Sequence, residues 1–178
     1  NASCGPCASY NPAYNALLAS NSSKITKISY QANFPGTDPM NAANPGPVST
    51  RRSYYSNTSV PRCYNFSMYG STGINPASVT QAQIDARYNT APDWSVTVTH
   101  QLTSGYDSAQ VVVLLGNATS STLTSGTTGS LKLHLVMVEE TVTYSSPPGS
   151  NGETVFHDVM REMIPNSSGT TLADSWTA

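Results

Sequence analysis

Two cysteines near the start of the sequence carry the clearest chemistry of the chain. They stand in the stretch Cys4-Gly5-Pro6-Cys7, and two thiols at this spacing can close a small disulfide ring. A cysteine in the first turn of a helix has its thiolate favoured by unpaired amides and by the helix dipole. Pro6 suits such a turn, because it lacks an N–H that would otherwise have no partner. The stretch therefore predicts thiol redox chemistry at the start of a helix.

The residues after the second cysteine favour that helix. They include several strong helix formers, namely Ala8, Ala13, Ala16, Leu17, Leu18 and Ala19. Pro12 stands inside the run, and we expect it to kink the helix.

This pattern resembles the active-site helix of the thioredoxin superfamily, in which a proline follows the CxxC motif at the spacing of Pro12. Further along, Ser59-Val60-Pro61 precedes a strand-like run that ends at Gly70. That stretch resembles the cis-proline loop that faces the CxxC motif in the same superfamily. The two motifs together are far more specific than either alone.

The resemblance implies a role for each of these residues. Cys4, nearer the helix start and more exposed, would attack as the thiolate, and Cys7 would resolve the mixed disulfide. Val60 and Pro61 would hold the backbone of the substrate beside the thiols. The dithiol is itself the redox group, so no cofactor is needed. The alternative is that the disulfide only fastens its helix in a protein with another role.

Four further stretches resemble the Omp28-like secreted or outer-membrane proteins of Bacteroidetes-type bacteria. They are Ile28-Ser29-Tyr30, Asp38-Pro39-Met40, the run from Arg51 to Tyr55, and the run from Tyr144 to Glu153. This resemblance implies a protein held outside the cytoplasm of a Gram-negative bacterium, in the periplasm, at the outer membrane or cell surface, or in the medium.

The composition agrees with an extracytoplasmic chain. Only 10% of the 178 residues are charged and the net charge is −2, which leaves no basic footprint for nucleic acid. Ser, Thr and Asn together make up 61 residues, so hydroxyls and amides rather than ions supply the polar surface. No apolar run reaches the length that spans a bilayer, which predicts a chain without a transmembrane segment.

The length and the order of patterns predict two domains. We expect a thioredoxin-like α/β domain over 1–90, a central sheet with flanking helices, followed by an antiparallel β-sandwich module over 91–178. A thioredoxin-like domain also needs a strand upstream of its CxxC motif. We therefore expect a truncated start, and a sandwich that is incomplete at its end.

Within the first segment the patterns predict a mixture of helices and strands. We expect a strand over 24–30, a loop over 31–47, a short helix over 48–55, a strand over 62–69 and a short helix over 79–88. The second segment reads as strands over 94–100, 109–115 and 131–143 with a mobile loop over 119–130. The stretch 153–164 fits either a helical turn or a bent strand.

The remaining reactive residues have plainer interpretations. Cys63 is either a third redox partner or, as we favour, a small apolar residue of a strand. His100, His134 and His157 are scattered and lack the spacing of metal ligands, so no metal site is predicted.

Short sequence motifs mark candidate sites of glycosylation. Six Asn-x-Ser/Thr sequons occur, at Asn1, Asn21, Asn57, Asn65, Asn117 and Asn166, but an Asn- and Ser/Thr-rich composition produces most of them by chance. Ser108 stands in Asp107-Ser108-Ala109, which resembles the O-glycosylation acceptor of Bacteroidetes-type bacteria.

Two functions follow from these observations. The first is thiol–disulfide exchange on extracytoplasmic proteins, whose thiols and disulfides would be the partners. The second is a non-catalytic structural or adhesive surface protein that assembles with copies of itself by strand exchange, using the thioredoxin-like fold as a scaffold.

Overall fold

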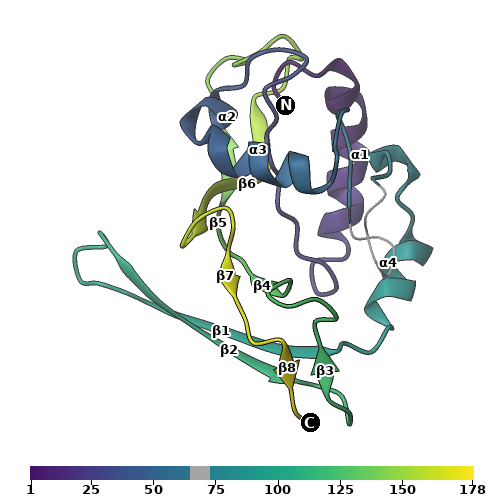
Figure 1. Ribbon diagram of the computed structural model, residues 1–178. Coiled ribbons are helices and arrows are strands. Elements are labelled where there is room, and N and C mark those ends of the chain that lie inside the picture. The colour runs from purple at the N-terminus through teal and green to yellow at the C-terminus, as the bar shows by residue number, and fades with distance from the viewer. Residues whose placement is uncertain (65–72) are drawn as a thin grey trace. The chain divides into compact units, whose positions relative to one another are not determined.

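The computed structural model describes residues 1–64 and 73–178, and the contacts divide the chain into two units (Figure 1). The first unit comprises Asn1–Asn89 and His134–Thr170, and the second comprises Thr90–Leu133 and Thr171–Ala178. This division differs from the two consecutive segments predicted, because residues 134–170 pack with the first unit.

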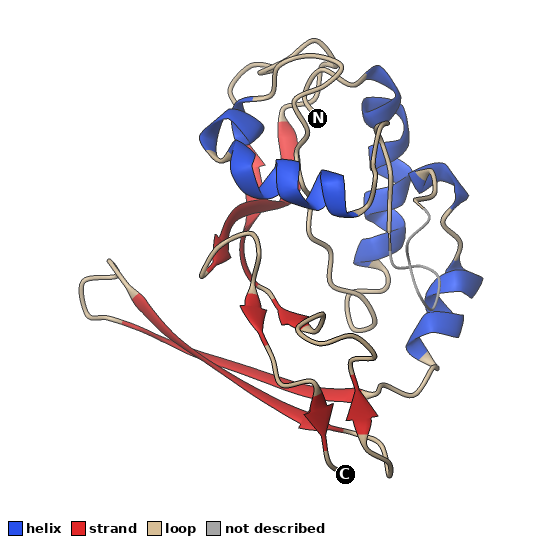
Figure 2. Ribbon diagram, viewed as in Figure 1, coloured by secondary structure: helices blue, strands red, loops and turns tan. Residues whose placement is uncertain are grey.

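The first unit combines helices with an antiparallel strand pair. Its helical elements are α1 (Gly5–Ala19), α2 (Pro39–Ala43), α3 (Pro45–Tyr54), the 3₁₀ turn η1 (Pro76–Ser78) and α4 (Gln81–Tyr88). Its strands are β5 (Leu135–Thr143) and β6 (Val155–Ile164). The helices of the described residues, blue in Figure 2, all belong to this unit by their residue ranges.

The second unit is built from short paired strands. They are β1 (Trp94–Leu102), β2 (Ala109–Asn117), β3 (Leu123–Thr124), β4 (Lys132–Leu133) and β8 (Ser175–Trp176), with β7 (Thr170–Thr171) at the boundary between the units. β1 pairs antiparallel with β2 over nine residues, β3 pairs antiparallel with β8, and β4 pairs with β7. The chain is therefore a mixed fold of helices and antiparallel strand pairs.

Local sequence signals explain where the helices begin. Cys4 caps α1, and Asp38 caps α2 by accepting the N–H groups of Met40 and Asn41. Thr80 and Gln83 form a capping box at the start of α4. The predicted loop over 31–47 was wrong in its second half, because prolines suit the first helical turn and here begin α2 and α3.

β6 supplies the centre of the first unit. Phe156 and Val159 pack with residues of β5 and α2, while Met160 and Met163 pack against Val48 of α3. The register of β5 and β6 shifts between Met137 and Val138. Of the two alternatives for 153–164, the structure has the bent strand, and this shift is where its pairing is interrupted.

The segment between α1 and α2 joins the strand pair at a single point. Ser29 forms an isolated parallel bridge with Val159, so the strand predicted over 24–30 is reduced to one bridge among the described residues. Cys63 forms an antiparallel bridge with Ile74. Most of the strand predicted over 62–69 lies outside the described residues.

A methionine pair tests how much the first unit depends on this packing. We expect Met163→Ala to lower the free energy of unfolding by about 2–5 kcal/mol, since Met163 is 1% exposed and its removal leaves a cavity. Met137→Ala on the paired strand should cost less than about 0.5 kcal/mol, because Met137 is 53% exposed. Equal losses in denaturant titrations would contradict the assignment of β6 to the core.

Candidate functional site

The two cysteines are joined in a disulfide at the start of α1. Their Cα atoms lie 5.2 Å apart and the S–S distance is 2.00 Å. Cys4 is the N-cap residue, and its Sγ accepts the backbone N–H of Cys7 at 3.1 Å. A sulfur in this position lies where backbone amides favour negative charge. The geometry thus suits the release of a thiolate from Cys4.

Both cysteines are buried in the oxidised protein. Cys4 is 1% exposed and Cys7 is 3% exposed. The prediction that Cys4 would be the more exposed of the two was therefore wrong. The physical reason is that two loops distant in sequence hold the residues around Cys4.

The first of these loops contains Asp38. Its buried carboxylate accepts the backbone N–H of Ala2 at 2.7 Å, in addition to the two N–H groups of α2. These bonds satisfy an anion that would otherwise be costly to bury. Asp38 therefore fixes the position of the chain two residues before Cys4.

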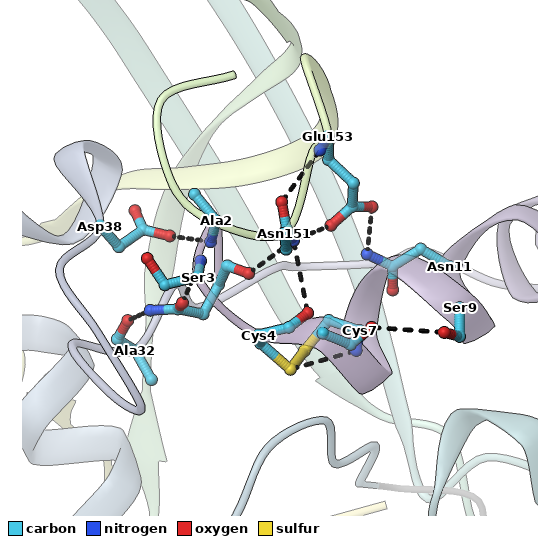
Figure 3. The surroundings of a disulfide bond; sticks show 12 residues. Ala2, Ser3, Cys4, Cys7, Ser9, Asn11, Ala32, Asp38, Asn151 and Glu153 are labelled. Atoms are coloured by element: carbon cyan, nitrogen blue, oxygen red, sulfur yellow. Dashed lines mark hydrogen bonds between the residues drawn. A yellow bond between two sulfur atoms is a disulfide. The ribbon is translucent and has the colours of Figure 1, made fainter.

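The second loop, residues 149–153 between β5 and β6, lies over the start of α1 (Figure 3). Asn151 donates its backbone N–H to the Ala2 carbonyl at 3.0 Å, and its side-chain amide to the Cys4 carbonyl at 3.4 Å. Glu153 accepts from Asn11 of α1 at 2.7 Å. A Cβ on Gly149 would clash with the Ala2 carbonyl, so this close approach requires glycine.

One face of the disulfide borders a cavity of about 460 Å³ in the first unit. Cys7 lines this cavity, and so do Val60 and Pro61, the residues predicted to bind substrate, whereas Cys4 does not. The peptide bond between Val60 and Pro61 is cis. Cavities of this size hold small ligands or a few residues of a peptide.

Cys63 is a free thiol on the same cavity. Burial raises the pKa of this thiol above its ordinary value, and a hydrogen bond from Tyr14 opposes that shift. Burial also raises the pKa of Tyr14. Burial thus favours the neutral thiol of Cys63, which is half-buried and forms an isolated bridge with Ile74.

The sequons differ in their surroundings. Asn21 is buried, and its amide nitrogen donates to Leu17 and Gln81, which leaves no N–H for a glycan. Both N–H groups of Asn117 are likewise engaged, by Ser121 and Trp176.

The other predicted acceptors are more accessible. Asn57 is half-buried, whereas Asn166 and Ser108 are exposed. Asn65 lies outside the described residues.

The described part of the chain lacks two further features. Among residues 1–64 and 73–178, no group of His, Cys, Asp or Glu side chains could hold a metal ion. Within the same residues, no helix has both the length and the apolar character needed to cross a bilayer.

Sequence reasoning did not assign a function to the residues that enclose the disulfide. Asp38 carried a local signal, since Asp followed by Pro is a common helix start. Asn151 and Glu153 carried none, because they meet α1 across about 140 residues of chain.

Comparisons of this chain with protein-family models, with curated proteins and with solved structures gave no significant match.

Opening of residues 149–153 should control access to the disulfide. We expect Asn151→Ala to speed reduction by dithiothreitol about tenfold, because it removes part-buried hydrogen bonds to the start of α1. Thiol trapping followed by mass spectrometry measures the rate. Asn166→Ala, on an exposed loop of the same unit, is the control and should leave the rate unchanged. Identical rates for both variants would show that this segment does not limit access.

Proposed function

We propose that this chain is an extracytoplasmic, thioredoxin-like protein that performs thiol–disulfide exchange through Cys4 and Cys7. The observation that carries the proposal is the position of the disulfide at the start of α1, with Cys7 bordering the cavity that Val60 and Pro61 also line. The likeness of the cysteine motif and of Val60-Pro61 to the thioredoxin superfamily supports it. The likeness of four other stretches, 28–30, 38–40, 51–55 and 144–153, to the Omp28-like proteins and the Ser-, Thr- and Asn-rich composition support the extracytoplasmic part.

A thioredoxin-like fold for the first unit is supported by the order of its elements. A helix that begins at the cysteine pair is followed by a segment that meets β6 through one parallel bridge, at Ser29. β5 then pairs with β6 in the antiparallel direction. For the second unit, the paired strands β1 to β4 and β8 are the building blocks that a β-sandwich would require.

The exchange would proceed in two balanced steps. A thiolate of the partner attacks one sulfur of the disulfide, the S–S bond breaks, and a mixed disulfide forms while the other cysteine leaves as a thiolate. A second partner thiolate then attacks the mixed disulfide, so the partner is oxidised and the Cys4–Cys7 pair is reduced to two thiols. If Cys4 is the leaving group, the N–H of Cys7 stabilises its charge.

Burial of both cysteines makes a conformational step part of this proposal. The partner can reach the sulfurs only after residues 149–153 move or after the cavity beside Cys7 opens. Asn151, Glu153 and Asn11 hold the closed state through a few hydrogen bonds, which is the order of stability expected of a segment that opens locally.

An exchange assay tests the proposal directly. The oxidised protein should transfer its disulfide to a reduced, unfolded test protein, and Cys4→Ser and Cys7→Ser should each abolish net transfer. Cys63→Ala should retain transfer within about twofold, because Cys63 is not part of the disulfide. Loss of transfer in Cys63→Ala alone, or equal transfer by the Cys4→Ser variant, would overturn the assignment.

A second candidate, assembly with copies of itself, is favoured by one feature of the second unit. The two nine-residue strands β1 and β2 contain no Asp, Glu, Lys or Arg, and apolar side chains such as Leu114 (64% exposed) stand in solvent. Edges without charges invite pairing with another chain. A mass that rises with concentration in sedimentation, together with a failed exchange assay, would favour this second function.

A further inference from the structure

The cavity beside Cys7 gathers most of the positive charge of the chain. Six of the eight Lys and Arg residues line it, namely Lys24, Lys27, Arg51, Arg52, Arg62 and Arg87. Among the described residues that line it, Glu153 carries the only carboxylate, and this group already accepts hydrogen bonds from Asn11 and Asn151. In a chain with a net charge of −2, this cavity is an electropositive exception.

Two of the six cations are neutralised by the protein itself. Lys24 pairs with Asp85 and Lys27 pairs with Asp158 at 3.0 Å. The four arginines have no carboxylate within ion-pair distance in the part of the chain that the structure describes. Four positive charges around one cavity therefore lack an acidic counterpart.

Aromatic rings, rather than carboxylates, hold the two arginines of α3 in place. Arg51 lies over the Tyr54 and Tyr55 rings at 4.8 and 5.0 Å, and Arg52 lies over Phe34 at 4.2 Å. The Nε atoms of both arginines are buried without a hydrogen-bond partner among the described residues. Buried donors without partners are costly, so an anionic ligand would find groups already oriented and dehydrated.

The same cavity runs along an open backbone edge. Ser29 uses both its N–H and its carbonyl to bond β6, through Asp158 at 2.7 Å and Met160 at 3.0 Å. Backbone groups alternate in direction along an extended chain, so those of Ile28 and Tyr30 point away from β6. Both residues line the cavity and make no backbone pairing with other described residues. An open edge of this kind is where an added strand binds.

We propose that this cavity binds an extended acidic segment of a polypeptide. The backbone of the segment pairs with Ile28 and Tyr30, and its carboxylates meet Arg51, Arg52, Arg62 and Arg87. The binding does not depend on the redox activity of the disulfide, because the cavity and its arginines are present in the oxidised protein.

Binding can be measured with short labelled peptides on the full-length oxidised protein. The probe alternates Glu with Val, and its partner peptide alternates Lys with Val. In fluorescence anisotropy at low salt, we expect the Glu peptide to bind, its affinity to fall as salt is raised, and the Lys peptide not to bind. Equal binding of the two peptides would overturn the proposal.

Charge-reversal variants locate the site. The double variant Arg62→Glu with Arg87→Glu changes two exposed side chains at the cavity. It should lower the affinity for the Glu peptide at least about tenfold. The control variant Lys132→Glu with Arg161→Glu changes the net charge by the same amount at two residues outside the cavity, and should change the affinity less than about twofold. Equal effects of the two changes would show attraction by net charge alone and would contradict a site.

The backbone part of the proposal has its own readout. Methylation of alternate backbone nitrogens of the Glu peptide should abolish binding, and the unmodified peptide should slow hydrogen exchange at the Ile28 and Tyr30 amides. Inorganic polyphosphate serves as a competitor of another class. If polyphosphate binds as tightly and methylation has no effect, the cavity is a general anion site and the strand proposal fails.

Discussion

The buried carboxylate of Asp38 is the constraint on which the site depends. It is 3% exposed and accepts three backbone N–H groups, from Ala2, Met40 and Asn41. Burying an anion is tolerable only when such donors compensate for lost water. The Asp38 side chain therefore caps α2 and also holds the residues that precede α1. It thereby fixes the position of Cys4.

The consequence is a disulfide that is well positioned yet closed to solvent. Helix α1 presents Cys4 at its N-cap, the loop that contains Asn151 lies over it, and the cavity reaches it only beside Cys7. Stability and activity thus pull in opposite directions at this site. A purely structural disulfide would be stabilised by residues 149–153 lying over it. In an oxidoreductase, these residues must move away from the disulfide during each cycle.

Local signals in the sequence predicted the local structure well. The helix after Cys7, the helix that ends at Tyr88 and the strands that begin at Trp94 and Ala109 all follow from propensity, capping and alternation. The start of α3 was missed, because a density of prolines was taken as a loop signal although proline also suits a first helical turn. The spacing of apolar residues over 153–164 fitted both a helix and a strand. The register shift between Met137 and Val138 explains this, because it disturbs the alternation of side chains along β6.

The arrangement of the site depended on contacts that no local pattern encodes. The cysteine pair and Val60-Pro61 were singled out from their motifs, and of these residues Cys7, Val60 and Pro61 line one cavity. Their roles in exchange stay a prediction. Burial of Cys4 could not be predicted, because it results from hydrogen bonds to residues far along the chain. The gathering of six cations was equally hidden, since they are spread from Lys24 to Arg87 and meet only when α3 and α4 border the same cavity.

The reduction potential of the Cys4–Cys7 pair tests the central claim most directly. It is measured by glutathione titration and thiol-trapping mass spectrometry, in a Cys63→Ala background so that only the pair is counted. Thiol–disulfide exchange as the function predicts a potential above about −300 mV, in the range of working oxidoreductases. A potential below about −300 mV, or a pair that exchanges only after denaturation, would show a structural disulfide and would contradict the proposed activity.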